Sequence, residues 1–201
     1  MMNSSSMSFS KKPAISTISN ASGAMCRAQP LKNRHTAHPL KCTMTIKLLC
    51  VGKIKARHLR LLLEDYRQRL QKYTSVEYRE LKAEKRPKTA KDATIKHREA
   101  TRLEQHIQPT EWVIALDEHG TQYSSTEFSA CIARYQMRSD IKTLVFVTGG
   151  ATGLSNAFLN NANMVLSLSK MTLPHQLCRL LLLEQLYRAY TILAGTSYHK
   201  G

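Results

Sequence analysis

The glycine-rich stretch at residues 148–154 (TGGATGL) is the first feature that could support chemistry. Its backbone amides are free of side-chain obstruction, which suits a nucleotide or nucleoside-like ligand that approaches the main chain. The stretch lacks the Gly-Lys-Ser/Thr of a P-loop, and it is no GxGxxG fingerprint with a following ribose carboxylate. A tight turn between a strand and a helix is therefore the alternative interpretation.

A second polar stretch, residues 166–176 (LSLSKMTLPHQ), leads into a long apolar segment. Pro174 fixes its own φ and lacks an N–H, so it fits the first turn of a helix, and Leu173 before it is biased toward an extended conformation. The loop therefore enters the helix with its main chain available for hydrogen bonding. His175 stands in that first turn, where a helix N-terminus disfavours a second proton on the ring. A capping or packing histidine is the alternative.

The chain ends in the sequence TSYHKG, which contains Tyr198, His199 and Lys200. These three side chains offer stacking, proton exchange and phosphate contact together, which are the interactions that an RNA site uses. A frayed terminus without function is the alternative.

These stretches need elements to position them, and the hydrophobic pattern predicts alternating strands and helices. Strands are expected at residues 46–51, 76–81, 112–116, 143–148 and 164–168. Helices are expected at residues 55–73, 94–106, 126–135, 155–162 and 174–194. This alternation predicts an α/β fold with a mostly parallel sheet. Open α/β sheets bind ligands beyond the carboxyl ends of their strands, so we expect one site built from residues 116–120, 148–153 and 168–173.

The predicted terminal helix is apolar almost all the way round, whereas a surface helix of a monomer buries a single stripe. Burial on two sides would place one face on the sheet and another against a second subunit. A core helix of a monomer is the alternative. Glu184 and Arg188 form a favourably ordered i,i+4 pair, and Arg179 is the other charge in the middle of the helix.

The chain of 201 residues has a formal net charge of +16. Residues 1–44 contain six basic residues and no acid, so +10 remains for the rest of the chain (16 minus 6). A polyanionic partner is indicated, and nucleic acid is the commonest one. The five cysteines show no CxxC or Cys/His ligand spacing, which indicates a reducing compartment and no structural zinc. The longest apolar run is far shorter than the roughly 20 residues of a membrane span, so we expect a soluble protein.

Residues 1–43 are rich in serine and in basic residues and lack acids, and they show no sustained periodicity. This composition fits an organellar transit peptide, for a chloroplast in preference to a mitochondrion. A disordered basic tail that touches RNA is a second interpretation, and a mis-assigned start before Met44, in a cytoplasmic protein, is a third. We expect one domain over residues 44–201.

Several segments together resemble the RlmH family of SPOUT-class methyltransferases, which methylate N3 of a pseudouridine in large-subunit ribosomal RNA. These segments are MTIKLLCVGKIK, LVFVTGGATGL, LSLSKMTLPHQLCRLLLLEQLYRAY and the terminal YHK. The similarity covers about residues 44–200 and leaves the first 43 residues outside it. The order and separations of the segments, rather than any one of them, make the resemblance specific.

The resemblance implies a SPOUT α/β knot, with a C-terminal trefoil knot, and a homodimer. The implied cofactor is S-adenosylmethionine, and no metal is required. Its expected contacts are Leu116, Gly149, Gly150, Leu168, Ser169, Lys170, Met171, Thr172 and Leu173. Four further residues are expected to shape the pocket for the target base: His175, Arg179, Tyr198 and His199. The tail that carries the last two can come from the other subunit of the dimer.

Methyl transfer to a ring nitrogen requires in-line alignment and loss of the imide proton. The group that takes the proton stays open on the sequence, with His199 and then His175 as the candidates. Lys170, Arg179 and Lys200 would favour the imide anion electrostatically.

Two other functions stay open on the sequence. One is a ribosome-binding assembly factor that has lost methyl transfer, and the other is a SPOUT methyltransferase that acts on tRNA. The expected partner is large-subunit rRNA or an assembled ribosome. Residues 82–93 (KAEKRPKTAKDA) form a compact basic loop where the family often has a longer one, so the RNA contacts of that loop are open as well.

Overall fold

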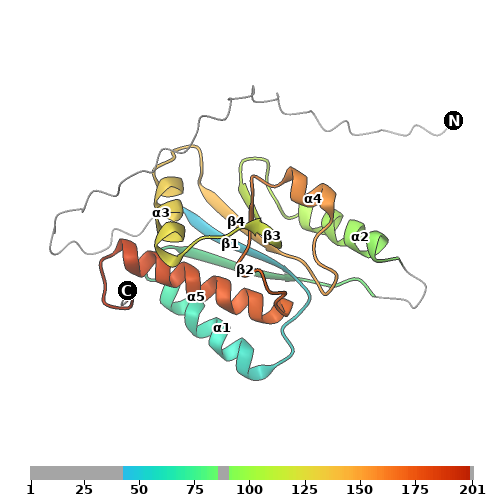
Figure 1. Ribbon diagram of the computed structural model, residues 1–201, viewed down its shortest axis with the longest axis horizontal. Coiled ribbons are helices and arrows are strands. Elements are labelled where there is room, and N and C mark those ends of the chain that lie inside the picture. The colour runs from blue at the N-terminus through green and yellow to red at the C-terminus, as the bar shows by residue number, and fades with distance from the viewer. Residues whose placement is uncertain (1–42, 86–90, 200–201) are drawn as a thin grey trace. The chain divides into compact units, whose positions relative to one another are not determined.

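The computed structural model describes residues 43–85 and 91–199, in which strands and helices alternate (Figure 1). The strands are β1 (Thr45–Val51), β2 (Ser75–Leu81), β3 (Trp112–Thr121), β4 (Thr143–Thr148) and β5 (Met164–Leu166). The helices are α1 (Arg57–Leu70), α2 (Asp92–Glu104), α3 (Ser125–Gln136), α4 (Asn156–Asn161) and α5 (His175–Leu193). The predicted α/β class is confirmed, whereas the predictions for residues 1–42 and Lys200 lie outside the described residues.

The five strands form one sheet in the order β2-β1-β4-β3-β5, and every neighbouring pair is parallel. The central strands β1 and β4 are buried along almost their whole length, as their continuous apolar runs predict. Strand β2 lies at an edge and alternates between buried and exposed residues. The predicted parallel sheet is therefore confirmed.

Helices cover both faces of the sheet: α1, α3 and α5 lie on one face, and α2 and α4 lie on the other (Figure 1). Successive side chains of a strand point to opposite faces, so neighbouring residues enter different cores. In β1, for example, Leu48 packs with the first set of helices and Leu49 with the second.

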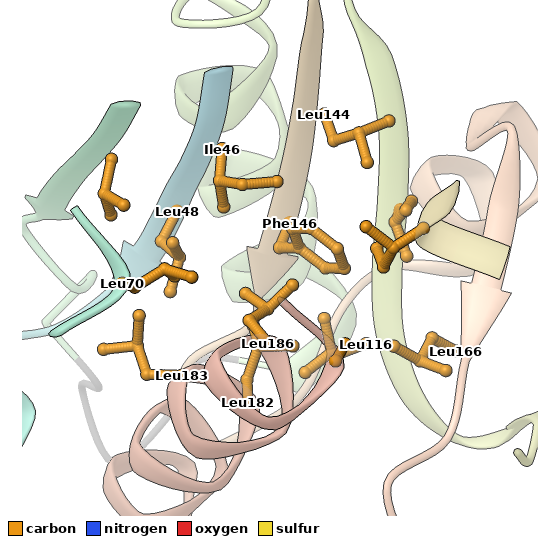
Figure 2. Close-up of a cluster of buried hydrophobic side chains, with 14 of the residues drawn as sticks. Ile46, Leu48, Leu70, Leu116, Leu144, Phe146, Leu166, Leu182, Leu183 and Leu186 are labelled. Carbon is orange, nitrogen blue, oxygen red and sulfur yellow. The ribbon is translucent and has the colours of Figure 1, made fainter. Parts of the chain in front are cut away.

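Helix α5 packs on the sheet through Leu182, Leu183 and Leu186, which point toward Leu48 and Phe146 (Figure 2). All three leucines are fully buried, and burial of a leucine side chain contributes about 1.5–3 kcal/mol.

The opposite side of α5 is open to solvent, since Leu177 and Leu181 are 39% and 41% exposed. Leu61 and Leu62 of α1 are exposed as well. The helix that the sequence predicts to be buried on two sides thus has one side on the sheet and another uncovered.

Strand β3 is longer than predicted, because it ends at Thr121 rather than at Leu116. Both Leu116 and Thr121 pair with Leu166 of β5, so the register shifts between them. The sequence predicts the end of the strand at Leu116 because polar residues follow it there. Backbone pairing with β5 nevertheless resumes at Thr121, after the register shift. The side chains of Asp117 and Glu118 consequently lie at the carboxyl end of the sheet.

No described helix is long and apolar enough to cross a membrane. Within the same described residues, no group of three or more histidine, cysteine, aspartate or glutamate residues is placed to hold a metal ion.

Candidate functional site

A cavity of about 830 Å³ opens at the carboxyl ends of β3, β4 and β5, and we call it the strand-end cavity. Its volume lies within the roughly 300–1,000 Å³ that is usual for small-molecule sites. The three predicted segments meet there. Eight of the nine residues predicted to contact the cofactor line this cavity: Leu116, Gly149, Gly150, Leu168, Ser169, Met171, Thr172 and Leu173. Lys170, which was also predicted, is not among the lining residues.

The turn after β4 forms one wall of the strand-end cavity. Gly150 and Gly153 form an antiparallel bridge, and the Gly153 N–H donates to the Gly150 carbonyl at 3.2 Å. A Cβ on Gly149 would lie 2.6 Å from the main-chain carbon of Gly153, a distance that no side chain tolerates. The glycine at position 149 is therefore required by the close approach of two backbone segments, and main-chain groups instead of side chains face the cavity here.

The loop between β5 and α5 also lines the strand-end cavity, and hydrogen bonds hold this loop in shape. Its start is tied to β3, because the Ser167 N–H donates to the Thr121 carbonyl at 2.9 Å. The Ser169 hydroxyl accepts from the Met171 N–H at 2.9 Å. Thr172 donates its hydroxyl hydrogen to the Glu118 carboxylate at 2.5 Å. The loop is therefore anchored at both ends of its polar stretch.

His175 begins α5 and lines the strand-end cavity, with Pro174 as the N-cap residue. Burial lowers the pKa of His175 below its ordinary value, and the positive charge of Arg179 lowers it further. A lowered pKa is also what the sequence predicts for a histidine in the first turn of a helix. Here, however, burial and the charge of Arg179 lower it, rather than the helix terminus. His175 is accordingly a neutral imidazole at neutral pH, able to accept a proton.

Arg179 is fully buried behind His175 and does not line the strand-end cavity. Its guanidinium donates to the main-chain carbonyls of Val51 and Gly52, the latter at 2.9 Å. A Glu80 oxygen lies 3.5 Å from the same guanidinium. Arg179 thus fastens the loop after β1 to α5, whereas the sequence places it around the target base.

The tail residues Tyr198 and His199 lie toward the other end of α5. The Tyr198 hydroxyl donates to Glu184 at 3.2 Å, and its ring packs on Tyr187. His199 Nδ1 is 3.4 Å from the Arg188 guanidinium. At 1.5 Å per residue, Arg188 is roughly 20 Å along the helix from its start, so the tail of this protomer does not reach its own cavity.

The structure adds charged residues that the sequence did not single out. Lys96 of α2 lines the strand-end cavity, as do Asp117 and Glu118 of β3. The acids stood in a predicted strand-end segment, but Lys96 lies some fifty residues before the glycine turn. No local pattern in the sequence links Lys96 to the glycine turn, and only the packing of α2 brings it there.

Glu99 is 5% exposed and lies behind the glycine turn, where a Cβ on Gly150 would be 3.0 Å from its Oε2. Its Oε1 accepts the Glu84 N–H at 3.0 Å, while Oε2 has no hydrogen-bond partner in the described part of the chain. Burial is the main reason that the pKa of Glu99 is raised.

A parallel α/β sheet with a cavity beyond the carboxyl ends of its strands has the arrangement in which α/β proteins bind their ligands. The family model described as "Predicted SPOUT methyltransferase" matches residues 44–199. The chain belongs to the SPOUT methyltransferase family.

Curated relatives carry the name ribosomal RNA large subunit methyltransferase H. The protein of Bifidobacterium animalis subsp. lactis is 44% identical over 160 residues, which are 78% of this chain and 100% of that protein. The Clostridium novyi protein is 42% identical with the same coverage. The Caldicellulosiruptor saccharolyticus protein is 40% identical over 155 residues, 77% of this chain and 99% of that protein.

Proposed function

We propose that this protein methylates N3 of a pseudouridine in large-subunit ribosomal RNA and uses S-adenosylmethionine as the methyl donor. The observation that carries the proposal is that the glycine turn and the loop before α5 line one cavity. The family of the chain and the names of its relatives support a methyltransferase with an rRNA substrate.

The strand-end cavity fits an adenosyl group. Gly149 leaves main-chain groups bare on one wall, and Leu116 and Leu168 offer apolar surface for a purine ring. The loop around Ser169 and Met171 lines the same cavity, and its internal hydrogen bond from the Met171 N–H to the Ser169 hydroxyl would hold it in one shape around the ligand. When bound, S-adenosylmethionine supplies a methyl group on a positively charged sulfur.

The residues of this chain would align the acceptor nitrogen and remove its proton. His175 lies at the cavity in neutral form, so it can accept the imide proton at neutral pH. His199 is the other candidate, and in our proposal it acts on the cavity of a partner subunit. Arg179 would act indirectly, since its guanidinium is bound to Val51, Gly52 and Glu80 and positions the loop after β1 behind His175.

We propose a homodimer with a trefoil knot, as in the family that the sequence resembles. The uncovered leucines of α5, Leu177 and Leu181, lie in the half of the helix nearest the strand-end cavity. A second copy on this face would bury them and bring the tail of one subunit toward the cavity of the other. The knot would be formed by the loop before α5, which is tied to β3 at Thr121.

The test is methyl transfer from labelled S-adenosylmethionine to ribosomes that lack the modification, followed by mass analysis of the nucleosides. We expect label in N3-methylpseudouridine of large-subunit rRNA. Label in a tRNA nucleoside would reassign the substrate. Cofactor binding without transfer to either RNA would favour the ribosome assembly factor. Binding should weaken steeply with salt, because a basic protein holds RNA largely through phosphates.

We also propose that residues 1–43, of which 1–42 lie outside the described residues, direct the protein to an organelle. Their serine-rich, acid-free composition supports the proposal. Imaging a fluorescent protein fused behind residues 1–43, against the same reporter fused to residues 44–201, tests it. Identical diffuse signals from both fusions would contradict an organellar address.

A further inference from the structure

Lys96 is the one lysine or arginine among the described residues that line the strand-end cavity. It stands on α2, and a Cβ on Gly153 would lie 3.9 Å from its ammonium nitrogen. The ammonium group therefore lies beside the glycine turn. Neither an ion pair nor a hydrogen bond joins it to another described residue, although the side chain is half-buried.

The cavity also holds two carboxylates, Asp117 and Glu118, so its three fixed charges are two negative and one positive. Each acid is partly engaged: Asp117 accepts from His119, and Glu118 accepts from Thr172. Both acids retain acceptor capacity, since an ionised carboxylate has about four lone-pair sites.

S-adenosylmethionine carries the opposite set of charges, namely a sulfonium, an ammonium and one carboxylate. We propose that Lys96 is a cofactor-binding residue whose ammonium group pairs with the carboxylate of S-adenosylmethionine. This assignment rests on the proposed cofactor. It extends the site to α2, an element outside the strand-end segments that hold the nucleoside part.

An RNA phosphate is the competing anion for Lys96. A phosphate that entered this cavity would meet Asp117 and Glu118, both negative, with Lys96 as the only fixed opposing charge among the described lining residues. The cofactor carboxylate arrives together with two cationic groups, which the same two acids attract. The charge pattern therefore favours the cofactor over the phosphate.

The experiment measures binding of two ligands by calorimetry: S-adenosylmethionine and decarboxylated S-adenosylmethionine, which lacks only the carboxylate. The unmodified protein should bind the first more tightly. Lys96→Ala should weaken its binding about tenfold, the size of one charge-assisted hydrogen bond, and leave the decarboxylated ligand unaffected. Lys96→Arg should restore the preference, because it keeps the charge.

Arg98→Ala is the matched control, since Arg98 is an exposed basic residue on the same helix that does not line the cavity. It should leave both affinities unchanged. Circular dichroism of each variant checks folding. The substitutions should not disturb it, because both side chains are at least partly exposed.

Equal weakening of both ligands by Lys96→Ala would overturn the assignment, because the effect would not depend on the carboxylate. Unchanged affinities together with a raised KM for ribosomes would also overturn it and assign Lys96 to an RNA phosphate. If the unmodified protein bound neither ligand, the proposed cofactor itself would fall, and the assignment with it. Only the last outcome touches the proposed function.

Discussion

The guanidinium of Arg179 donates a hydrogen bond of 2.9 Å to the main-chain carbonyl of Gly52, which lies 127 positions earlier in the chain. This contact ties the loop after the first strand to the terminal helix, directly behind His175. A Cβ on Gly52 would lie 3.8 Å from His175 Nε2, so the same loop also packs against the histidine.

Replacing Arg179 with alanine should lower the free energy of unfolding by about 3–5 kcal/mol, because Glu80 and two main-chain carbonyls lose their buried cation. Urea denaturation measures the change. Arg138→Ala removes an exposed partner of Asp140 and should lower the free energy of unfolding far less. Similar costs for the two variants would mean that the buried contact is not structurally important.

His175 should make the stability of the protein depend on pH. Its pKa is lowered in the folded state, so below the ordinary value of 6.5 the unfolded chain binds the proton more readily. The contribution of His175 to the free energy of unfolding is therefore fully present above pH 6.5. It is lost as the pH falls from 6.5 through the lowered pKa of the folded state. His175→Gln should flatten the slope of unfolding free energy between about pH 5 and 7. An unchanged slope would show that the histidine titrates normally.

Gly149→Ala should abolish the main-chain wall of the strand-end cavity, since its Cβ would collide with the backbone of Gly153. We expect the affinity for S-adenosylmethionine to fall about tenfold or more, measured by calorimetry. Gly195→Ala is the control: its φ of +65° is strained for alanine, but a Cβ there meets nothing within 4 Å. It should cost stability, about 1 kcal/mol, without weakening cofactor binding.

The proposed dimer can be tested at Leu181, which is 41% exposed on α5. Leu181→Asp should convert the dimer to a monomer in light scattering, because a charge in an apolar interface is costly to bury. Met137→Asp changes a residue that is 78% exposed near the end of α3 and should leave the mass unchanged. A monomeric mass for the unmodified protein would remove the basis of the dimer.

A mixed dimer tests whether the tail acts on the partner subunit. One copy carries Gly149→Ala and the other carries His199→Ala, with different affinity tags. If tails act across the interface, one of the two sites combines an intact cavity with an intact tail, and we expect about half of the methyl transfer of the unmodified dimer. Tails that act within their own subunit would leave the mixed dimer inactive.

Several features follow from the sequence because they depend on local pattern. Continuous apolar runs predicted the buried strands β1 and β4, and alternation with helices predicted the parallel sheet. Parallel strands bring their carboxyl ends to one edge of the sheet, so the sequence predicts that the segments around Gly149 and Ser169 meet there, as they do.

Tertiary structure alone decided the features that join distant segments. Nothing near Arg179 in the chain reveals that it is buried, because its partners Gly52 and Glu80 lie about a hundred or more positions away. Lys96 reaches the strand-end cavity only because α2 packs beside the glycine turn. The tail lies far from its own cavity because α5 is long and rigid. Local pattern determines which elements form, whereas side-chain packing between elements determines which charges face the site.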